Sequence, residues 1–292
     1  MTAISEHRIA LTCGENRYLE AGNGPPLLLL HGMGVATSAN SQDLLIPHLA
    51  TRFRVLAPDL LGFGLGTRQV QAGPTFELIL DQLREFMDRL GLAQMQVVGH
   101  SLGGWLGGLL AYQSPQRVRR LVMLSSAGLN REPAAGVGTK LQPSREQLRD
   151  LLRGWLHEPG RLSAAEQDQV VDGLLAAAAA PGAATSLDPL LAQMQSPAVR
   201  ERYMLHRRLP FIAVPTLMLW GEHDPLDPYP TWSAQFDALA GDMHRSSKPW
   251  APPGARFARL PCGHHPQWEL PQQTAQLIGD FLLASDSATQ RP

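Results

Sequence analysis

Short apolar runs alternate with stretches of helical spacing along most of this chain. Leu27–Leu30 is continuously apolar, as expected of a strand that is buried on both faces of a parallel sheet. Residues 75–90 carry apolar side chains three and four positions apart, and Gly91 follows as a helix stop signal. Further strand-like runs lie at 53–59, 96–98, 118–125, 214–220 and 256–260. The repeated strand–helix order predicts an α/β fold, in which helices cover both faces of a mostly parallel sheet.

The pattern changes between residues 130 and 208, where no strand-like run is found. The segments 144–147 and 163–166 both have the spacing of a capping box, so a helix should follow each of them. We therefore expect residues 130–208 to form a helical cap. The core domain would then consist of residues 1–129 and 209–292.

Composition limits the partners of such a protein. A chain of 292 residues with 44% hydrophobic residues can bury a sizeable core, and a net charge of -1 gives no general attraction to nucleic acid or to an anionic membrane. Only Cys13 and Cys262 carry thiols, far apart in sequence, so a disulfide framework is not expected. The N-terminus has neither a basic segment nor a long apolar stretch. We expect a cytoplasmic protein without membrane or nucleic-acid partners, and a homodimer stays open.

One strand-like run leads directly into Gly99-His100-Ser101-Leu102-Gly103. Glycines on both sides of the serine permit a sharp strand–turn–helix bend with the hydroxyl exposed at the turn, a nucleophile elbow. The same short pattern also occurs in ordinary turns. A serine hydroxyl is a weak nucleophile near neutral pH and needs a base that a third group orients. The pattern predicts Ser101 as a nucleophile if such partners exist.

Polar residues that could serve as partners follow two later strand-like runs. Catalytic groups of open α/β sheets lie at the carboxyl ends of strands. Asp224 follows one run, and His264 and His265 follow the last one. The order serine, aspartate, histidine is the order expected with a nucleophile elbow. Asp227 is an alternative acid, but Asp224 is nearer to the strand end, and the residues alone leave either histidine as the base.

A serine nucleophile also needs two N–H groups aimed at the negative charge that develops on the substrate, an oxyanion hole. Leu102 begins the helix after the elbow, where the helix dipole favours an anion. His31-Gly32-Met33-Gly34 follows the first buried strand. We expect the second donor from this loop, at Met33.

Together these motifs resemble the α/β-hydrolase-fold serine hydrolases that carry a helical cap, over essentially the whole chain. The segments that carry the resemblance are His31-Gly32-Met33-Gly34, Asp59-x-x-Gly62-Phe63-Gly64, Gly99-His100-Ser101-Leu102-Gly103-Gly104, Gly221-Glu222-His223-Asp224 and Gly263-His264 with Glu269. The resemblance implies that His264, directly after the glycine, is the base. It also implies a structural role for Asp59.

We expect neither a metal nor an organic cofactor. The cysteines and histidines lack the spacing of a zinc site, and no phosphate-binding glycine loop precedes a lysine. The partner expected is a small-molecule substrate, enclosed between the cap and Ser101.

Residues 263–269 are similar to the base loop of the meta-cleavage product hydrolases, which cleave a carbon–carbon bond in vinylogous 1,5-diketone acids. That resemblance implies a cap arginine for the substrate carboxylate, and we select Arg202 from the arginines at 200, 202, 207 and 208. Trp105 and Trp268 are the aromatic residues expected to contact substrate.

Val35-Ala36-Thr37 departs from the Gly-Pro-Gly type that is common in this group. Cleavage of an ester, a lactone or a thioester therefore stays open. A catalytically inactive binding protein on the same fold is the alternative from a different class.

Overall fold

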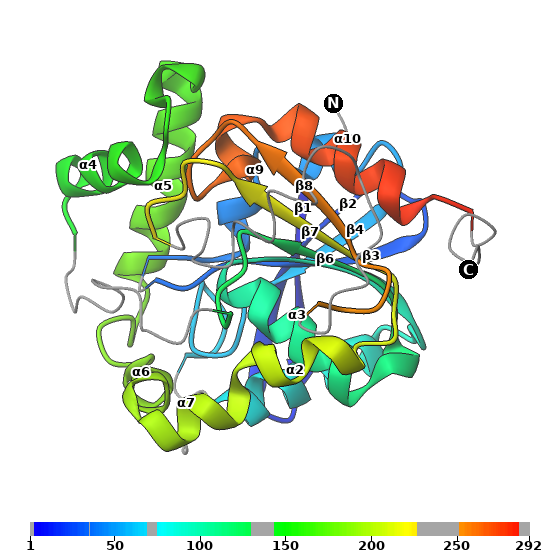
Figure 1. Ribbon diagram of the computed structural model, residues 1–292. Helices are drawn as coiled ribbons and strands as arrows, with labels where there is room; N and C mark the ends of the chain where they lie inside the picture. Colours follow the sequence, from blue (N-terminus) through cyan, green and yellow to red (C-terminus); the bar gives the residue numbers. More distant parts are fainter. Residues whose placement is uncertain (1–2, 35, 69–74, 130–142, 227–250, 286–292) are drawn as a thin grey trace.

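The computed structural model describes residues 3–34, 36–68, 75–129, 143–226 and 251–285, and its strands form one twisted sheet (Figure 1). Within these residues the sheet has eight strands in the order β1-β2-β4-β3-β5-β6-β7-β8. The strands are β1 (Ser5–Leu11), β2 (Gly14–Ala21), β3 (Pro26–Leu30), β4 (Arg54–Pro58), β5 (Met95–His100), β6 (Val118–Leu124), β7 (Thr216–Gly221) and β8 (Arg256–Leu260). Only the β1–β2 and β2–β4 pairs are antiparallel. The predicted mostly parallel α/β sheet is confirmed.

Helices cover both faces of this sheet. The α-helices are α1 (Ile46–Leu49), α2 (Phe76–Arg89), α3 (Leu102–Gln113), α4 (Arg145–Trp155), α5 (Ala164–Ala179), α6 (Asp188–Gln195), α7 (Pro197–Tyr203), α9 (Pro266–Glu269) and α10 (Pro271–Leu282). Short 3-10 turns are η1 (Ala39–Gln42), η2 (Pro115–Arg117), η3 (Pro159–Arg161), η4 (Leu205–Arg207) and η5 (Leu209–Phe211). Helices α2 and α3 lie on one side of the sheet, and α9 and α10 lie on the other (Figure 1).

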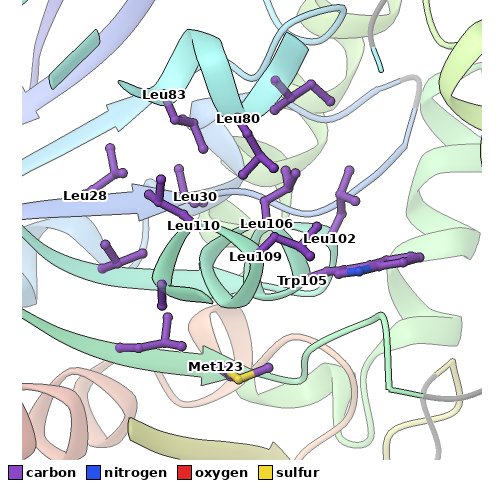
Figure 2. Packing of buried hydrophobic residues seen from close by; sticks show 14 of the residues in the cluster. Leu28, Leu30, Leu80, Leu83, Leu102, Trp105, Leu106, Leu109, Leu110 and Met123 are labelled. Atoms are coloured by element: carbon purple, nitrogen blue, oxygen red, sulfur yellow. The ribbon is translucent and has the colours of Figure 1, made fainter. Parts of the chain in front are cut away.

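The central strand β3 explains why an uninterrupted apolar run was needed. Successive side chains of a strand point to opposite faces. Leu28 and Leu30 pack with leucines of α2 and α3, as Figure 2 shows. Leu27 and Leu29 join the other cluster, which includes residues of α1 and α10. Both faces of β3 are therefore buried, so the strand is held rigidly and fixes the start of the loop that follows it.

From residue 143 onward, the described part of the segment between β6 and β7 contains helices and 3-10 turns joined by short loops, and no strand. Ser144 and Gln147 bond each other reciprocally at the start of α4, and Ser163 and Glu166 do the same at the start of α5. Both helices expected from capping boxes are therefore present. Apolar residues of α4 and α5 pack together, and Trp268 from outside the segment joins their cluster. The cap boundaries 130–208 stay a prediction, since 130–142 lie outside the described residues.

None of the helices in the described part of the chain is both long and apolar enough to cross a membrane. Cys13 and Cys262 are free thiols, of which Cys262 is buried. Burial raises the pKa of the Cys262 thiol far above its usual range, so this group is neutral at physiological pH.

Candidate active site

Four parallel strands bring the predicted site residues to one edge of the sheet. The strands β3, β5, β7 and β8 run in the same direction through the register of the sheet. Their carboxyl ends lead to His31, Ser101, Asp224 and His264 in turn. Because this edge is where open α/β sheets bind ligands, it is the candidate active site.

The elbow places Ser101 in a strained backbone conformation. Its φ of 51° is in the left-handed region that residues other than glycine rarely adopt. Backbone hydrogen bonds hold the turn, since Ser101 N–H donates to Leu124 O at 3.0 Å and Ala127 N–H donates to Ser101 O at 3.0 Å. A Cβ on Gly99 would lie 2.1 Å from Gly103 O. Strand and helix thus approach so closely that residue 99 must be glycine, which is the reason for the motif.

His264 is paired with Asp224 in a buried contact. Its Nδ1 lies 2.7 Å from Asp224 Oδ2, and the two side chains are 4% and 0% exposed. The other carboxylate oxygen of Asp224 accepts a hydrogen bond from Leu226 N–H at 2.9 Å. A carboxylate at Nδ1 fixes the proton there and leaves Nε2 as the nitrogen that can accept one. Asp227, the alternative acid, lies outside the described residues.

His265 has a different set of contacts. Gln267 Nε2 donates to its Nδ1 at 2.9 Å, and its ring stacks on Trp268 with centroids 3.8 Å apart. Burial lowers the pKa of His265 well below its usual value. The structure therefore brings His264 and not His265 to the acid.

A third histidine supports the backbone of His264. His100 Nε2 donates to His264 O at 2.8 Å. Burial, together with the nearby His264, lowers the pKa of His100 well below its usual value. His100 and His265 are thus both neutral near pH 7, so no fixed positive charge next to His264 opposes its protonation.

The loop after β3 is held by side chains that set the direction of one peptide group. Leu60 N–H donates to His31 Nε2 at 3.0 Å, so the ring proton of His31 is on Nδ1, which donates to Gly32 O at 2.7 Å. Thr37 Oγ1 lies 3.1 Å from the same oxygen and 2.8 Å from Gly34 O. Because the C=O and N–H of a trans peptide point in opposite directions, Met33 N–H points away from the His31 and Thr37 side chains. A Cβ on Gly32 would lie 3.2 Å from Ser101 Cβ, so this loop runs directly beside the elbow.

Asp59 lies at the centre of a structural network. Its carboxylate accepts hydrogen bonds from Ala39 N–H and Leu65 N–H, each at 2.7 Å, and faces Arg17 at 3.3 Å. Asp59 is fully buried, and a Cβ on Gly64 would lie 2.0 Å from its Cγ. These contacts fix the loop after β4 and agree with the structural role expected for Asp59.

The three predicted substrate-binding residues have unequal positions. Trp105 and Trp268 are each 2% exposed, and their indole N–H groups donate to Tyr203 O at 2.8 Å and to Ser41 O at 2.7 Å. They can offer only ring surface to a substrate, and their role stays a prediction. The Arg202 side chain is 72% exposed, with Glu77 4.0 Å away. Its position on the surface of α7 does not favour a contact in a buried site, and its role as a substrate-binding residue stays a prediction.

Sequence reasoning missed two residues of the site region. Thr37 Oγ1 contacts the carbonyl oxygens of Gly32 and Gly34, but a single threonine in a loop gives no pattern that identifies it. Glu269 was noted only as part of a motif. In the structure it is 4% exposed, and its Oε1 accepts a hydrogen bond from Gly263 N–H at 2.5 Å, directly before the predicted base.

The ring nitrogens of His100, His264 and His265 also gather within 4.8 Å of one another, the one such group of possible metal ligands in the described ranges. Zinc–nitrogen bonds of ~2.0–2.1 Å in a tetrahedral site would place ligand nitrogens about 3.4 Å apart. Each ring also has one nitrogen bonded to another protein group. The cluster fits a hydrogen-bonded support for His264 better than a metal site.

Comparisons with known proteins agree with this architecture. The sequence model of the α/β hydrolase fold family matches residues 25–170, half of the chain. The chain is 30% identical over 278 residues to a 2-hydroxymuconate semialdehyde hydrolase of Pseudomonas sp., covering 92% of this chain and 90% of that protein. It is 28% identical over 290 residues to a 2-hydroxy-6-oxo-2,4-heptadienoate hydrolase of Pseudomonas putida, covering 96% and 97% of the two chains.

A solved structure shares the fold over nearly the full length. It is a 2-hydroxy-6-oxo-6-phenylhexa-2,4-dienoate hydrolase from Rhodococcus sp., with a TM-score of 0.79, 22% identity, and 97% and 100% of the two chains covered. The fold and the sequence matches lead to one conclusion. The chain belongs to the α/β hydrolase fold family, as a hydrolase of the group that contains the meta-cleavage product hydrolases.

Proposed function

We propose that this protein hydrolyses the carbon–carbon bond beside the 6-oxo group of a 2-hydroxy-6-oxo-dienoate, with Ser101 as nucleophile, His264 as base and Asp224 as the acid that orients it. The observation that carries this proposal is the 2.7 Å contact between His264 Nδ1 and Asp224 Oδ2, at the same sheet edge as the strained Ser101. Sequence similarity to a 2-hydroxymuconate semialdehyde hydrolase and to a 2-hydroxy-6-oxo-2,4-heptadienoate hydrolase supports the substrate class.

In the first step His264 Nε2 accepts the proton of Ser101 Oγ as that oxygen bonds to the 6-oxo carbon. Negative charge then develops on the former ketone oxygen. Leu102 N–H, at the first position of α3, and Met33 N–H are the proposed donors to it. The direction of Met33 N–H, away from the His31 and Thr37 side chains, supports this role.

Cleavage of a carbon–carbon bond requires a stabilised carbanion as the leaving group. In the 2-oxo tautomer of the substrate, in which the 2-hydroxyl proton has moved to carbon 5, the electron pair of the broken bond can delocalise through the adjacent double bond onto the 2-oxo oxygen. The proton held by His264 is then delivered to this leaving group, which departs as a 2-hydroxydienoate. Water, deprotonated by His264, finally attacks the acyl carbon and releases Ser101 and a carboxylic acid.

Three of the four arginines considered from the sequence have positions that do not favour contact with a buried substrate carboxylate. Arg202 and Arg207 are 72% and 67% exposed. Arg208 donates to the backbone oxygens of Met204 and Arg202. The preference for a substrate that carries a carboxylate therefore has to be measured on this protein and not inferred from its relatives.

The test uses purified protein with 2-hydroxy-6-oxohepta-2,4-dienoate, the methyl ester of the same compound, and p-nitrophenyl acetate. We expect the yellow colour of the dienoate to bleach with formation of acetate, at a kcat/KM above that for the nitrophenyl ester. Ser101→Ala should lower kcat by at least about 10³-fold. Fast turnover of the nitrophenyl ester with the dienoate left intact would overturn the carbon–carbon assignment and favour an ester hydrolase.

A catalytically inactive binding protein is the remaining alternative, and one reagent separates it from an enzyme. A fluorophosphonate reacts with a serine that a neighbouring base activates. Labelling at Ser101, identified by mass spectrometry of the peptide, is expected. An unlabelled protein that still binds the dienoate would favour the binding function.

A further inference from the structure

The segment that follows α4 is joined to the loop that carries His264. We call residues 155–161 the cap strap and residues 261–265 the base loop. Trp155 O accepts a hydrogen bond from His264 N–H at 3.0 Å, so the backbone of the predicted base is bonded to the segment between β6 and β7. A Cβ on Gly263 would lie 2.3 Å from the same oxygen. The glycine before His264 is therefore what allows the two segments to come so close.

One buried carboxylate bonds both segments at once. Glu269 Oε1 accepts a hydrogen bond from Gly263 N–H of the base loop at 2.5 Å. Its Oε2 accepts from His157 N–H at 3.1 Å and from Glu158 N–H at 2.9 Å, both in the cap strap. Glu269 itself belongs to neither segment, since it ends α9. Hydrogen bonds from backbone N–H groups to an ionised carboxylate are among the stronger ones in proteins.

Two further contacts extend the junction. Arg161 Nη1 donates to Pro261 O at 2.6 Å. The His157 ring stacks on His223 with centroids 3.6 Å apart, and His223 N–H donates to Cys262 O at 3.0 Å. His223 directly precedes Asp224. The cap strap thus contacts the segments of both the base and the acid.

We propose that Glu269 is a positioning residue. Through its hydrogen bonds to both segments, it makes the alignment of His264 with Asp224 depend on the cap strap being held against the base loop. The inference rests on the catalytic role of His264 in the proposed function. When the cap strap lies against the base loop, the N–H groups of Gly263 and His264 both have fixed acceptors. Without the Glu269 carboxylate, Gly263 N–H and two strap N–H groups lose their acceptor together, and the base loop can shift. A displacement of about 1 Å at a catalytic group can lower a rate by about 10²-fold.

The variant that tests this is Glu269→Gln, which keeps the shape but turns an N–H donor toward at least one backbone N–H. Glu166→Gln is the matched control, because Glu166 Oε2 also accepts a backbone N–H, that of Ser163, at 2.8 Å, but lies at the exposed start of α5. The readout is the rate of Ser101 phosphonylation by a fluorophosphonate across pH, with kcat and KM on whichever substrate is turned over. Circular dichroism and thermal unfolding establish that each variant is folded.

We expect Glu269→Gln to slow phosphonylation and kcat by about 10²-fold with a smaller change in KM, while Glu166→Gln stays near wild type. The midpoint of the pH profile should move to lower pH, because an imidazole that is less well held against Asp224 binds its proton less tightly. A folded Glu269→Gln protein with wild-type rate and midpoint would overturn the inference. An unlabelled wild-type protein would instead overturn the proposed function, so the two failures are distinct.

If Glu269→Gln does not fold, Arg161→Met takes its place. This variant removes the bond to Pro261 O and leaves the Glu269 carboxylate intact. The inference requires slower phosphonylation and the same direction of midpoint shift, by smaller amounts. Unchanged values in Arg161→Met would overturn it.

Discussion

His100 Nε2 donates a hydrogen bond to the backbone oxygen of His264 at 2.8 Å, across a separation of 164 residues in sequence. The residue directly before the predicted nucleophile therefore holds the main chain of the predicted base. This contact fixes the base loop from the side of the elbow.

Replacing His100 by leucine should lower kcat by about ten- to a hundredfold, because the lost hydrogen bond leaves a buried carbonyl without its donor and lets the base loop relax. His100→Gln presents an amide N–H at a similar reach and should recover part of the activity. Steady-state kinetics on both variants, with thermal unfolding as a check on folding, measure this. Equal activity in His100→Leu and wild type would show that the bond does not position His264.

Buried neutral histidines should make the protein less stable below neutral pH. Burial lowers the folded-state pKa of His31, His100 and His265 below the usual value of 6.5. As the pH falls below 6.5, the unfolded chain takes up protons that the folded protein does not, so the free energy of unfolding falls. The free energy of unfolding falls by at most about 1.4 kcal/mol per pH unit for each histidine. Urea unfolding at several pH values between 7.5 and 5 tests this.

His265→Gln provides the comparison for that measurement. It removes one of the three titrating rings, so its free energy of unfolding should depend less steeply on pH between 6.5 and 5. His48→Gln is the control, because His48 is exposed on α1. A wild-type slope in His265→Gln would mean that this ring does not stay neutral in the folded state.

The elements that set up the site were readable from sequence because they depend on local rules. A continuous apolar run such as Leu27–Leu30 is typical of a strand buried on both faces, and the close approach of β5 and α3 requires glycine at position 99. The network around Asp59 was visible only as a family motif. Its physical cause is hydrogen bonding between segments that no local rule connects.

Contacts across long separations could not be predicted in the same way. Arg202 was selected as one of several arginines near the end of the cap, yet its side chain lies on the solvent side of α7. Which face of a short helix is buried depends on what packs against it, and residues 197–203 are too short for a clear pattern. The bonds from Glu269 to His157 and Glu158 span more than a hundred residues, so only the folded chain reveals them.

Asp43 opposes the effect of the histidines on acid stability. It is partly buried, Asn40 Nδ2 donates to its Oδ2 at 2.9 Å, and its Oδ1 has no hydrogen-bond partner among the described residues. Burial raises the pKa of Asp43 from 3.8 to about 6. Above pH 6 the carboxylate is ionised in both states, and its burial costs up to about 3 kcal/mol of stability. That cost disappears as the pH falls from 6 toward 4.

Asp43→Asn should therefore raise the free energy of unfolding by about 1–3 kcal/mol at pH 8, with a gain that shrinks below pH 6. Asp81→Asn serves as the control, since the Asp81 side chain is 68% exposed. Denaturant titrations of both variants at pH 8 and pH 5 measure the change in the free energy of unfolding. A gain of the same size at both pH values would contradict the assigned cause.

Arg68 joins the loop after β4 to the last turn of α5. It is 3% exposed, its Nε donates to Gly64 O at 2.7 Å, and its Nη2 donates to Ala177 O at 2.7 Å. Ala177 lies in the last turn of α5, where a cation is favoured, and its carbonyl oxygen also accepts a hydrogen bond from Ala180 N–H at 3.3 Å. Burial lowers the pKa of Arg68, but a guanidinium stays charged.

Arg68→Met should lower the free energy of unfolding by about 2–3 kcal/mol, because two buried carbonyls lose a charged donor. Arg68→Lys should recover only part of this, since a single ammonium lacks the planar fork that reaches both oxygens. Hydrogen exchange should rise in α5 before it rises in α10, which Arg68 does not contact. Arg89→Met, at a side chain 55% exposed on α2, is the control. Uniform exchange in both helices of Arg68→Met would show that Arg68 stabilises the whole fold and not the attachment of α5.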